Sequence, residues 1–162
     1  MVAWATEVIT WDQIGEIVQI GTVESLGRLR RSEQQLKTYH AFMDQVRQDY
    51  ASVADFIKIS VLDSASKLNA EGKKEAVDSE HDTQQLVWHL NDFPYYFEDD
   101  VQHWLLWSTH KPLEQPAIQQ QVAAKFPEQQ WEHITFVNPV ALQSVLVIWH
   151  CHVLVRPKQQ LN

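Results

Sequence analysis

The spacing of apolar residues changes from helical to strand-like across one polar segment, residues 63–82. Before this segment, apolar side chains recur every three or four residues, as in residues 11–20, which is typical of amphipathic helices. After it come short apolar runs, such as residues 103–108 and 148–155, bounded by polar residues or proline as strands are. We therefore predict an α+β fold with N-terminal helices packed on an antiparallel sheet.

Capping signals divide the N-terminal half of the chain into several helices. Thr10 precedes an acidic first turn, and Ser32 with Gln35 has the spacing of a capping box. Gly21 can end the first helix, a short helix follows from residue 22 or 23, and two more are expected to about residues 50 and 62. The segment 63–82 is polar, with almost no large apolar side chains, and predicts an exposed, mobile loop.

The C-terminal half predicts strands at 86–88, 103–108 and 131–137 and one within 144–156 that ends at Pro157. Pro116 suits the first position of a helix running to about residue 126. We expect one domain over residues 1–162, with helices in residues 1–62, a polar loop over 63–82 and a strand-rich region over 83–157.

Composition excludes several classes of function. The net charge of −8 argues against general nucleic-acid binding, which requires clustered Lys and Arg. The short basic run of Arg28, Arg30 and Arg31 is interpreted as a solvated turn between helices. No glycine follows Gly72, so the C-terminal half holds neither a phosphate-binding loop nor a dinucleotide fingerprint, and we expect no cofactor.

Other features of the sequence favour a cytoplasmic protein. No apolar run approaches the ~20 residues that span a bilayer. The N-terminus lacks the basic and apolar regions of a signal peptide. Cys151 is the single cysteine, so the fold does not depend on an internal disulfide. We therefore expect a cytoplasmic location and no membrane span.

Two histidines in the last predicted strand carry the main functional signal. Because side chains alternate along a strand, His150 and His152 point to one face, whereas Trp149 and Cys151 point to the other. Such a pair suits metal ligation, phosphate binding, or a nucleophile with a proton donor. No Asp or Glu follows His152, so we expect no metal, although the pair can also be purely structural.

Four further polar residues lie at the starts or ends of neighbouring predicted strands: Asn91, Asp92, His103 and Asn138. Each alone is typical of a turn. Together with the His pair they predict one ligand-binding site, with His103, Asn138 and Ser144 as hydrogen-bond partners of the imidazoles.

Several motifs resemble the family named after the N-acetylglucosamine-induced protein of fungi. They are NDFPYYF at 91–97, HWLLWS at 103–108, WEHITFVNPVALQSV at 131–145 and WHCHVLVR at 149–156. The N-terminal pattern ESLGRLRRSEQQLKTYHAF is also similar, so the resemblance covers nearly the whole chain. The family name records an expression response and implies no reaction.

The order of segments is similar, more weakly, to that of histidine-triad nucleotide-binding proteins. This resemblance implies that His150 is the phosphate-attacking nucleophile and His152 the third triad residue. It also implies that Asn91 or Asp92 holds a ribose hydroxyl and that Asn138, Gln143 and Ser144 lie near the phosphate. Ile148 stands at the first triad position.

Two functions follow as hypotheses. One is binding or hydrolysis of a nucleotide or phosphorylated sugar in a His-lined pocket, with His150 and His152 as the catalytic pair. The other is a non-enzymatic interaction protein, or a subunit of a larger complex, with a protein partner that binds its aromatic surface.

Overall fold

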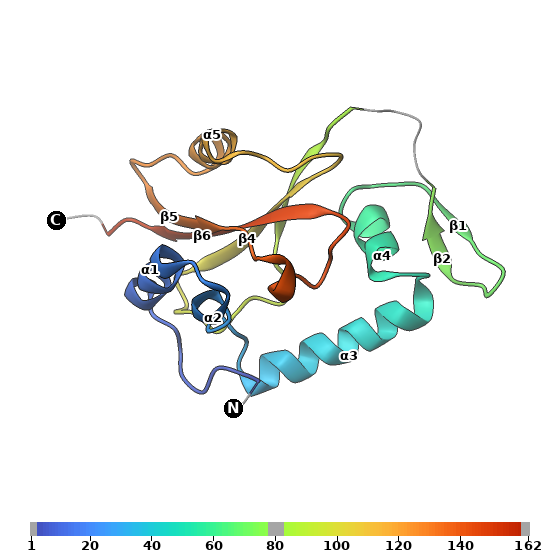
Figure 1. Ribbon diagram of the computed structural model, residues 1–162, viewed down its shortest axis with the longest axis horizontal. Coiled ribbons are helices and arrows are strands. Elements are labelled where there is room, and N and C mark those ends of the chain that lie inside the picture. Colours follow the sequence, from blue (N-terminus) through green and yellow to red (C-terminus); the bar gives the residue numbers. More distant parts are fainter. Residues whose placement is uncertain (1–2, 78–82, 160–162) are drawn as a thin grey trace.

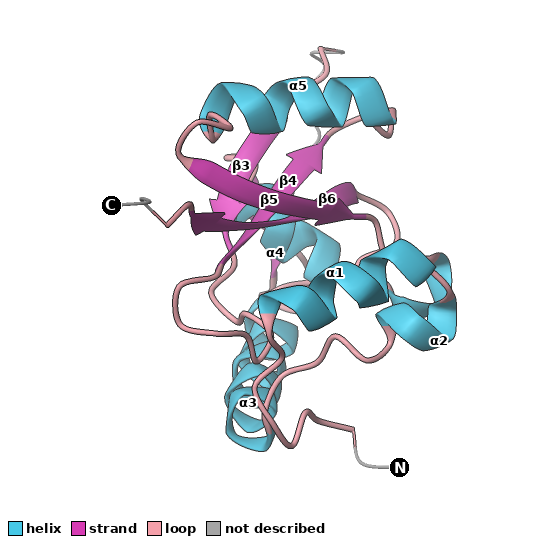
Figure 2. Cartoon of the chain, turned by 90° about the vertical axis from the view of Figure 1, so that its left-hand side faces the viewer, coloured by secondary structure: helices cyan, strands magenta, loops and turns pink. Residues whose placement is uncertain are grey.

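A four-stranded antiparallel sheet forms the centre of the computed structural model, which describes residues 3–77 and 83–159 (Figure 1). Its strands run in the order β3 (Leu86–Leu90), β4 (Gln102–Ser108), β6 (Trp149–Pro157) and β5 (Trp131–Phe136). Helix α5 (Gln115–Lys125) covers one face, and the N-terminal helices lie on the other side (Figure 2). The prediction of an α+β fold is confirmed.

The N-terminal helices begin where the capping signals predict. They are α1 (Trp11–Ile20), α2 (Val23–Leu26), α3 (Glu33–Asp49) and α4 (Val53–Ser60). Thr10 and Ser32 each form a capping box with the glutamine three residues later, and Gly21 ends α1 in the left-handed conformation. Within residues 3–77 and 83–159, none of the helices has the length and apolar character needed to cross a membrane.

The α5 face of the sheet holds an apolar core. Ile118 and Val122 of α5 are no more than 1% exposed. They pack on the side chains of Leu106, Cys151, Val153 and Val155, with several half-buried tryptophans around them. Trp149 belongs to this face, as strand alternation predicts.

The opposite face has two apolar clusters with histidines between them. At one end, α1 packs on Leu154 and Phe136. At the other, Ile57 of α4 packs with Trp107. The side chains of His103, His150 and His152 lie in the same layer and are all buried. The helices therefore enclose a polar centre within an apolar surround.

The polar segment 63–82 differs from its prediction. It contains an antiparallel hairpin of β1 (Ser66–Leu68), which is exposed, and β2 (Lys74–Ala76), which is partly buried, so the prediction of a loop is wrong for these residues. Their mobility stays a prediction. The hairpin is held from outside: the Asp55 carboxylate accepts a hydrogen bond from the Ala76 amide, and the Ala51 amide donates to the Lys74 carbonyl, both at 2.9 Å. Residues 78–82 of the predicted loop lie outside the described residues.

The packing of α5 gives a first testable prediction. Ile118→Ala should lower the free energy of unfolding by about 2–5 kcal/mol, because it removes a buried side chain between α5 and the sheet. Gln120→Ala, on the exposed side of the same helix, should change it by less than about 0.5 kcal/mol. Urea unfolding of both variants measures the difference. Equal small effects would show that α5 does not cover the sheet.

Candidate functional site

A cavity of about 450 Å³ lies between the histidine face of the sheet and helices α3 and α4. We call it the histidine cavity. His150 and His152 line it from β6, and Asn138 and Ser144 line it from the segment after β5. Polar and aromatic side chains complete its walls, with Arg31, Asn91, Asp92, Tyr39, Phe42, Phe56, Phe93 and Tyr95 among the lining residues.

His103 lies behind this cavity rather than in its wall. Its side chain is 2% exposed and is absent from the cavity lining. Its Nε2 lies 2.8 Å from His152 Nδ1, which joins the two central strands β4 and β6. His103 does not line this cavity and contacts His152, which does. That His103 takes part in ligand binding stays a prediction.

Main-chain geometry decides which nitrogen atoms of these imidazoles carry hydrogen. The Tyr95 amide donates to His103 Nδ1 at 3.3 Å. The Asn91 carboxamide nitrogen lies 3.5 Å from the same atom, and its oxygen is held by the Phe93 amide at 2.9 Å. A backbone amide can only donate, so His103 Nδ1 is the acceptor and the hydrogen of the neutral ring is on Nε2.

The direction of this hydrogen-bond chain then carries over to His152. His103 Nε2–H donates to His152 Nδ1, so the hydrogen of a neutral His152 is on Nε2, on the side of Asn138. The Asn138 carboxamide nitrogen lies 3.3 Å from His152 Nε2. Rotating that carboxamide by half a turn places its oxygen, which can accept, next to His152 Nε2–H. Each hydrogen bond of the chain then has one donor and one acceptor.

His150 has the opposite tautomer. Its Nδ1 lies 3.4 Å from the Ile148 carbonyl oxygen, which can only accept, so Nδ1 carries the hydrogen and Nε2 keeps the lone pair. The ring stacks on Trp107 with centroids 4.4 Å apart. The two histidines of the cavity therefore differ, because His152 Nε2–H donates to Asn138, whereas His150 Nε2 keeps a lone pair.

The surroundings keep all three imidazoles neutral. Burial lowers the pKa of His103 to about 3, with further contributions from the charge of Arg31 and from His150. Burial also lowers the pKa of His152 well below its usual value, and His103, His150 and Arg31 add to the effect. The pKa of His150 is lowered mainly by burial. None of the three is cationic at neutral pH.

Arg31 is the residue of the site that the sequence did not reveal. It was expected in a solvated turn, yet its guanidinium is half-buried, 4.0 Å over the Tyr39 ring and 5.3 Å from that of Tyr95. Its Nε–H donates to the Phe93 carbonyl at 2.9 Å. Tyr39 follows eight residues later, in α3, but Phe93 and Tyr95 are more than 60 residues away, so the sequence around residue 31 does not indicate the whole set of contacts.

The remaining expected site residues differ in position. Asn91, Asp92, Asn138 and Ser144 line the histidine cavity. Gln143 does not: its side-chain nitrogen donates to the Asn138 carbonyl at 2.7 Å, so it braces the segment after β5. The Asp92 carboxylate is exposed to solvent and pairs with His89 at 3.1 Å.

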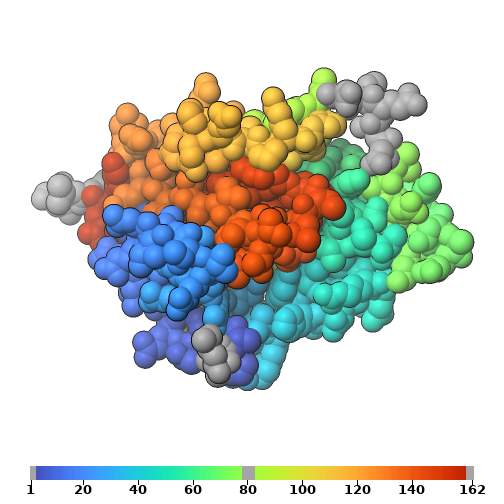
Figure 3. Space-filling model, viewed as in Figure 1, coloured from blue at the N-terminus to red at the C-terminus, as the bar shows by residue number. Residues whose placement is uncertain are grey.

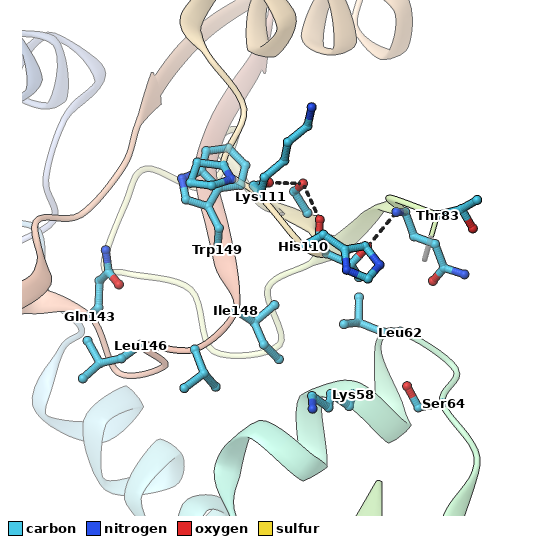
Figure 4. A pocket seen from close by; sticks show the side chains of 15 residues that line it. Lys58, Leu62, Ser64, Thr83, His110, Lys111, Gln143, Leu146, Ile148 and Trp149 are labelled. Atoms are coloured by element: carbon cyan, nitrogen blue, oxygen red, sulfur yellow. Dashed lines mark hydrogen bonds between the residues drawn. The ribbon is translucent and has the colours of Figure 1, made fainter. Parts of the chain in front are cut away.

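Gln143 lines a different and larger cavity, of about 560 Å³ (Figure 4). Lys58 and Leu62 border it on the α4 side, and Trp149 lies on its opposite side (Figure 4). The Lys111 side chain extends away from the other labelled groups. None of the three buried imidazoles lines this space, so its size does not make it the better candidate. Among residues 3–77 and 83–159, no three His, Cys, Asp or Glu side chains are grouped to hold a metal ion.

The depressed pKa values predict a loss of stability in acid. An unfolded histidine takes up a proton near pH 6.5, whereas folded His103 does so near pH 3 and His152 also well below 6.5. Their contribution is complete above pH 6.5 and falls as the pH drops, by about 1 kcal/mol per pH unit for each ring. The free energy of unfolding should therefore decrease between pH 7 and pH 5.

The comparison with variants isolates the buried rings from other titrating groups. His152→Gln should show a decrease that is shallower by about 1 kcal/mol per pH unit. His40→Gln, on the exposed side of α3, should follow the unmodified protein. Denaturant unfolding at several pH values measures the slopes. An unchanged slope for His152→Gln would mean that this ring titrates normally in the folded chain.

Known proteins resemble this chain over most of its length. It is 31% identical to "Uncharacterized protein YPL067C" of Saccharomyces cerevisiae, over 89% of this chain and 77% of that protein. It is 27% identical to "N-acetylglucosamine-induced protein 1" of Candida albicans, over 91% of this chain and 68% of that protein. A solved structure titled "Crystal Structure of HTC1" is 26% identical, with a TM-score of 0.59, over 91% of this chain and 84% of that one.

These similarities confirm the predicted relationship to the N-acetylglucosamine-induced protein, whereas the likeness to histidine-triad proteins stays a prediction. The family match includes every residue of the histidine cavity, since it extends over residues 10–156. The chain belongs to the family described as "Protein of unknown function (DUF3605)".

Proposed function

We propose that the protein binds a phosphorylated small molecule, such as a nucleotide or phosphorylated sugar, in the histidine cavity. The observation that carries this proposal is the guanidinium of Arg31. Among the described residues no carboxylate forms an ion pair with it, although it is half-buried beside the cavity. A cation removed from water in this way is stabilised by an anionic ligand, and Arg is well suited to phosphate.

The neutral histidines support the same ligand. The Asn138 carboxamide N–H and the Ser144 hydroxyl are hydrogen-bond donors in the cavity wall, and His152 Nε2–H holds that carboxamide in place by donating to its oxygen. The acidic group in the described lining, Asp92, is exposed and paired with His89. The cavity wall thus holds several donors, while its carboxylate is exposed to solvent and paired.

Hydrolysis is the extension of this function that His150 favours. Its Nε2 lone pair can attack phosphorus, forming an N–P bond as the bond to the leaving group breaks and that group departs with the electron pair. Water then cleaves the N–P bond, returns the lone pair to His150 and releases one proton to solvent. His152 donates a hydrogen bond but cannot give up its proton without becoming an imidazolate, so only leaving groups stable as anions would react.

A surface segment supports the alternative, an interaction protein. Val140, Leu146 and Val147, between β5 and β6, are 71%, 64% and 76% exposed. This segment reaches the surface between α1–α2 and α3–α4 (orange-red in Figure 3). Exposed aliphatic side chains of this kind occur at protein interfaces.

Phosphate binding tests the role of Arg31. Inorganic phosphate should raise the melting temperature of the protein, since a ligand that binds only the folded state stabilises it. Arg31→Met should weaken phosphate binding about tenfold or more, the effect of a lost charge-assisted hydrogen bond, and alter unliganded stability by no more than about 1 kcal/mol. Arg28→Met, at an exposed position in the same run, should bind as before. Equal effects of both variants would place the anion elsewhere.

A second experiment tests His150 as nucleophile. Incubation with 4-nitrophenyl phosphate should give a phosphorylated protein, detected by intact mass, with release of about one equivalent of 4-nitrophenolate. His150→Ala should remove the adduct and the ligand binding while changing stability by about 1–2 kcal/mol. His40→Ala should keep both. A His150→Ala protein that loses stability but binds normally would make this histidine structural.

A further inference from the structure

The histidine cavity adjoins a second, smaller hollow of about 200 Å³. Four residues line both spaces: Arg31, Tyr95, Asn138 and Leu142. Arg31 therefore borders two cavities rather than the closed end of one. A ligand whose anionic group lies at Arg31 has space on either side of that group.

We propose that the ligand is a phosphodiester or phosphoanhydride, whose phosphoryl group lies at Arg31 with one substituent in each space. This inference rests on the proposed phosphate-binding function and narrows it. The anionic group of a carboxylate or a phosphate monoester has a single substituent, so such a ligand would fill one space only. A phosphoryl group with two substituents still carries a negative charge. It can therefore bind the Arg31 guanidinium while one substituent lies in each of the two spaces that Arg31 lines.

The two spaces select different substituents. The histidine cavity has aromatic side chains in its wall, with the Phe42 ring centroid 4.8 Å from that of Phe93 and 5.5 Å from that of Phe56. Such walls favour a planar ring, which packs against them edge-on or in parallel. The substituent there is therefore aromatic, and the nearby polar groups hold the phosphoryl group to which it is attached.

The smaller hollow has a mixed wall, with Leu26, Leu29 and Leu36 on the aliphatic part and Arg30 among its polar residues. Its volume of about 200 Å³ is enough for a group the size of a benzene ring, since an engineered apolar cavity of about 150 Å³ holds benzene. Leu36 lines this hollow but not the histidine cavity, and it is only partly buried on α3. A larger side chain at this position would fill one space and leave the other unchanged.

Phenyl phosphate and diphenyl phosphate distinguish one-sided from two-sided binding. Leu36→Trp should weaken diphenyl phosphate about tenfold or more and change phenyl phosphate by less than about twofold, as measured by calorimetric titration. Lys37→Trp adds the same ring at the next, exposed position and should leave both affinities unchanged. If Leu36→Trp does not fold, Leu36→Phe adds a smaller ring. It should also weaken the binding of diphenyl phosphate more than that of phenyl phosphate.

The outcomes separate the two proposals. Equal effects of Leu36→Trp on both esters, or no effect on either, would overturn two-sided binding while phosphate binding at Arg31 stands. Failure of both esters and of inorganic phosphate to bind the unmodified protein would overturn the proposed function together with this inference. A selective loss of diphenyl phosphate that Lys37→Trp does not reproduce supports the proposal.

Discussion

The buried hydrogen bond between His103 and His152 connects the architecture of the protein with its candidate chemistry. It joins the two central strands, β4 and β6, at 2.8 Å in a layer that is otherwise apolar. Imidazoles in such a layer must be neutral and hydrogen-bonded to be tolerated. The Tyr95 amide meets that requirement at one end and fixes the direction of every later bond in the chain. The tautomers of His103 and His152 thus follow from the main-chain amide of Tyr95, and that of His150 follows from the Ile148 carbonyl.

The neutrality of the three buried histidines also determines where positive charge lies in the cavity wall. Three neutral rings leave the Arg31 guanidinium as the permanent positive charge among the described residues of the histidine cavity wall. The same cation lowers the pKa values of His103 and His152, so charge at Arg31 and neutrality of the histidines reinforce each other. An anionic ligand would partly offset this repulsion between positive charges. The proposed binding of an anion would therefore be coupled to histidine protonation through Arg31.

Features that depend on local pattern could be predicted from the sequence. Capping residues at Thr10 and Ser32 fixed helix starts, and alternation along β6 put His150 and His152 on one face. The hairpin of β1 and β2 was missed because its short strands have no apolar alternation and are held by Asp55 and by main-chain contacts from outside. Arg31 was missed for a related reason, since its partners Tyr39, Phe93 and Tyr95 lie at different distances along the chain.

The tautomers of the three buried histidines can be measured directly. Nitrogen-15 NMR of histidine-labelled protein distinguishes protonated from unprotonated ring nitrogen atoms. At pH 7 we expect hydrogen on Nε2 of His103 and His152 and on Nδ1 of His150, with no imidazolium among the three. An imidazolium at His103 or His152, or hydrogen on Nδ1 of His103, would contradict the hydrogen-bond chain described above, because the Tyr95 amide could then no longer donate to that ring.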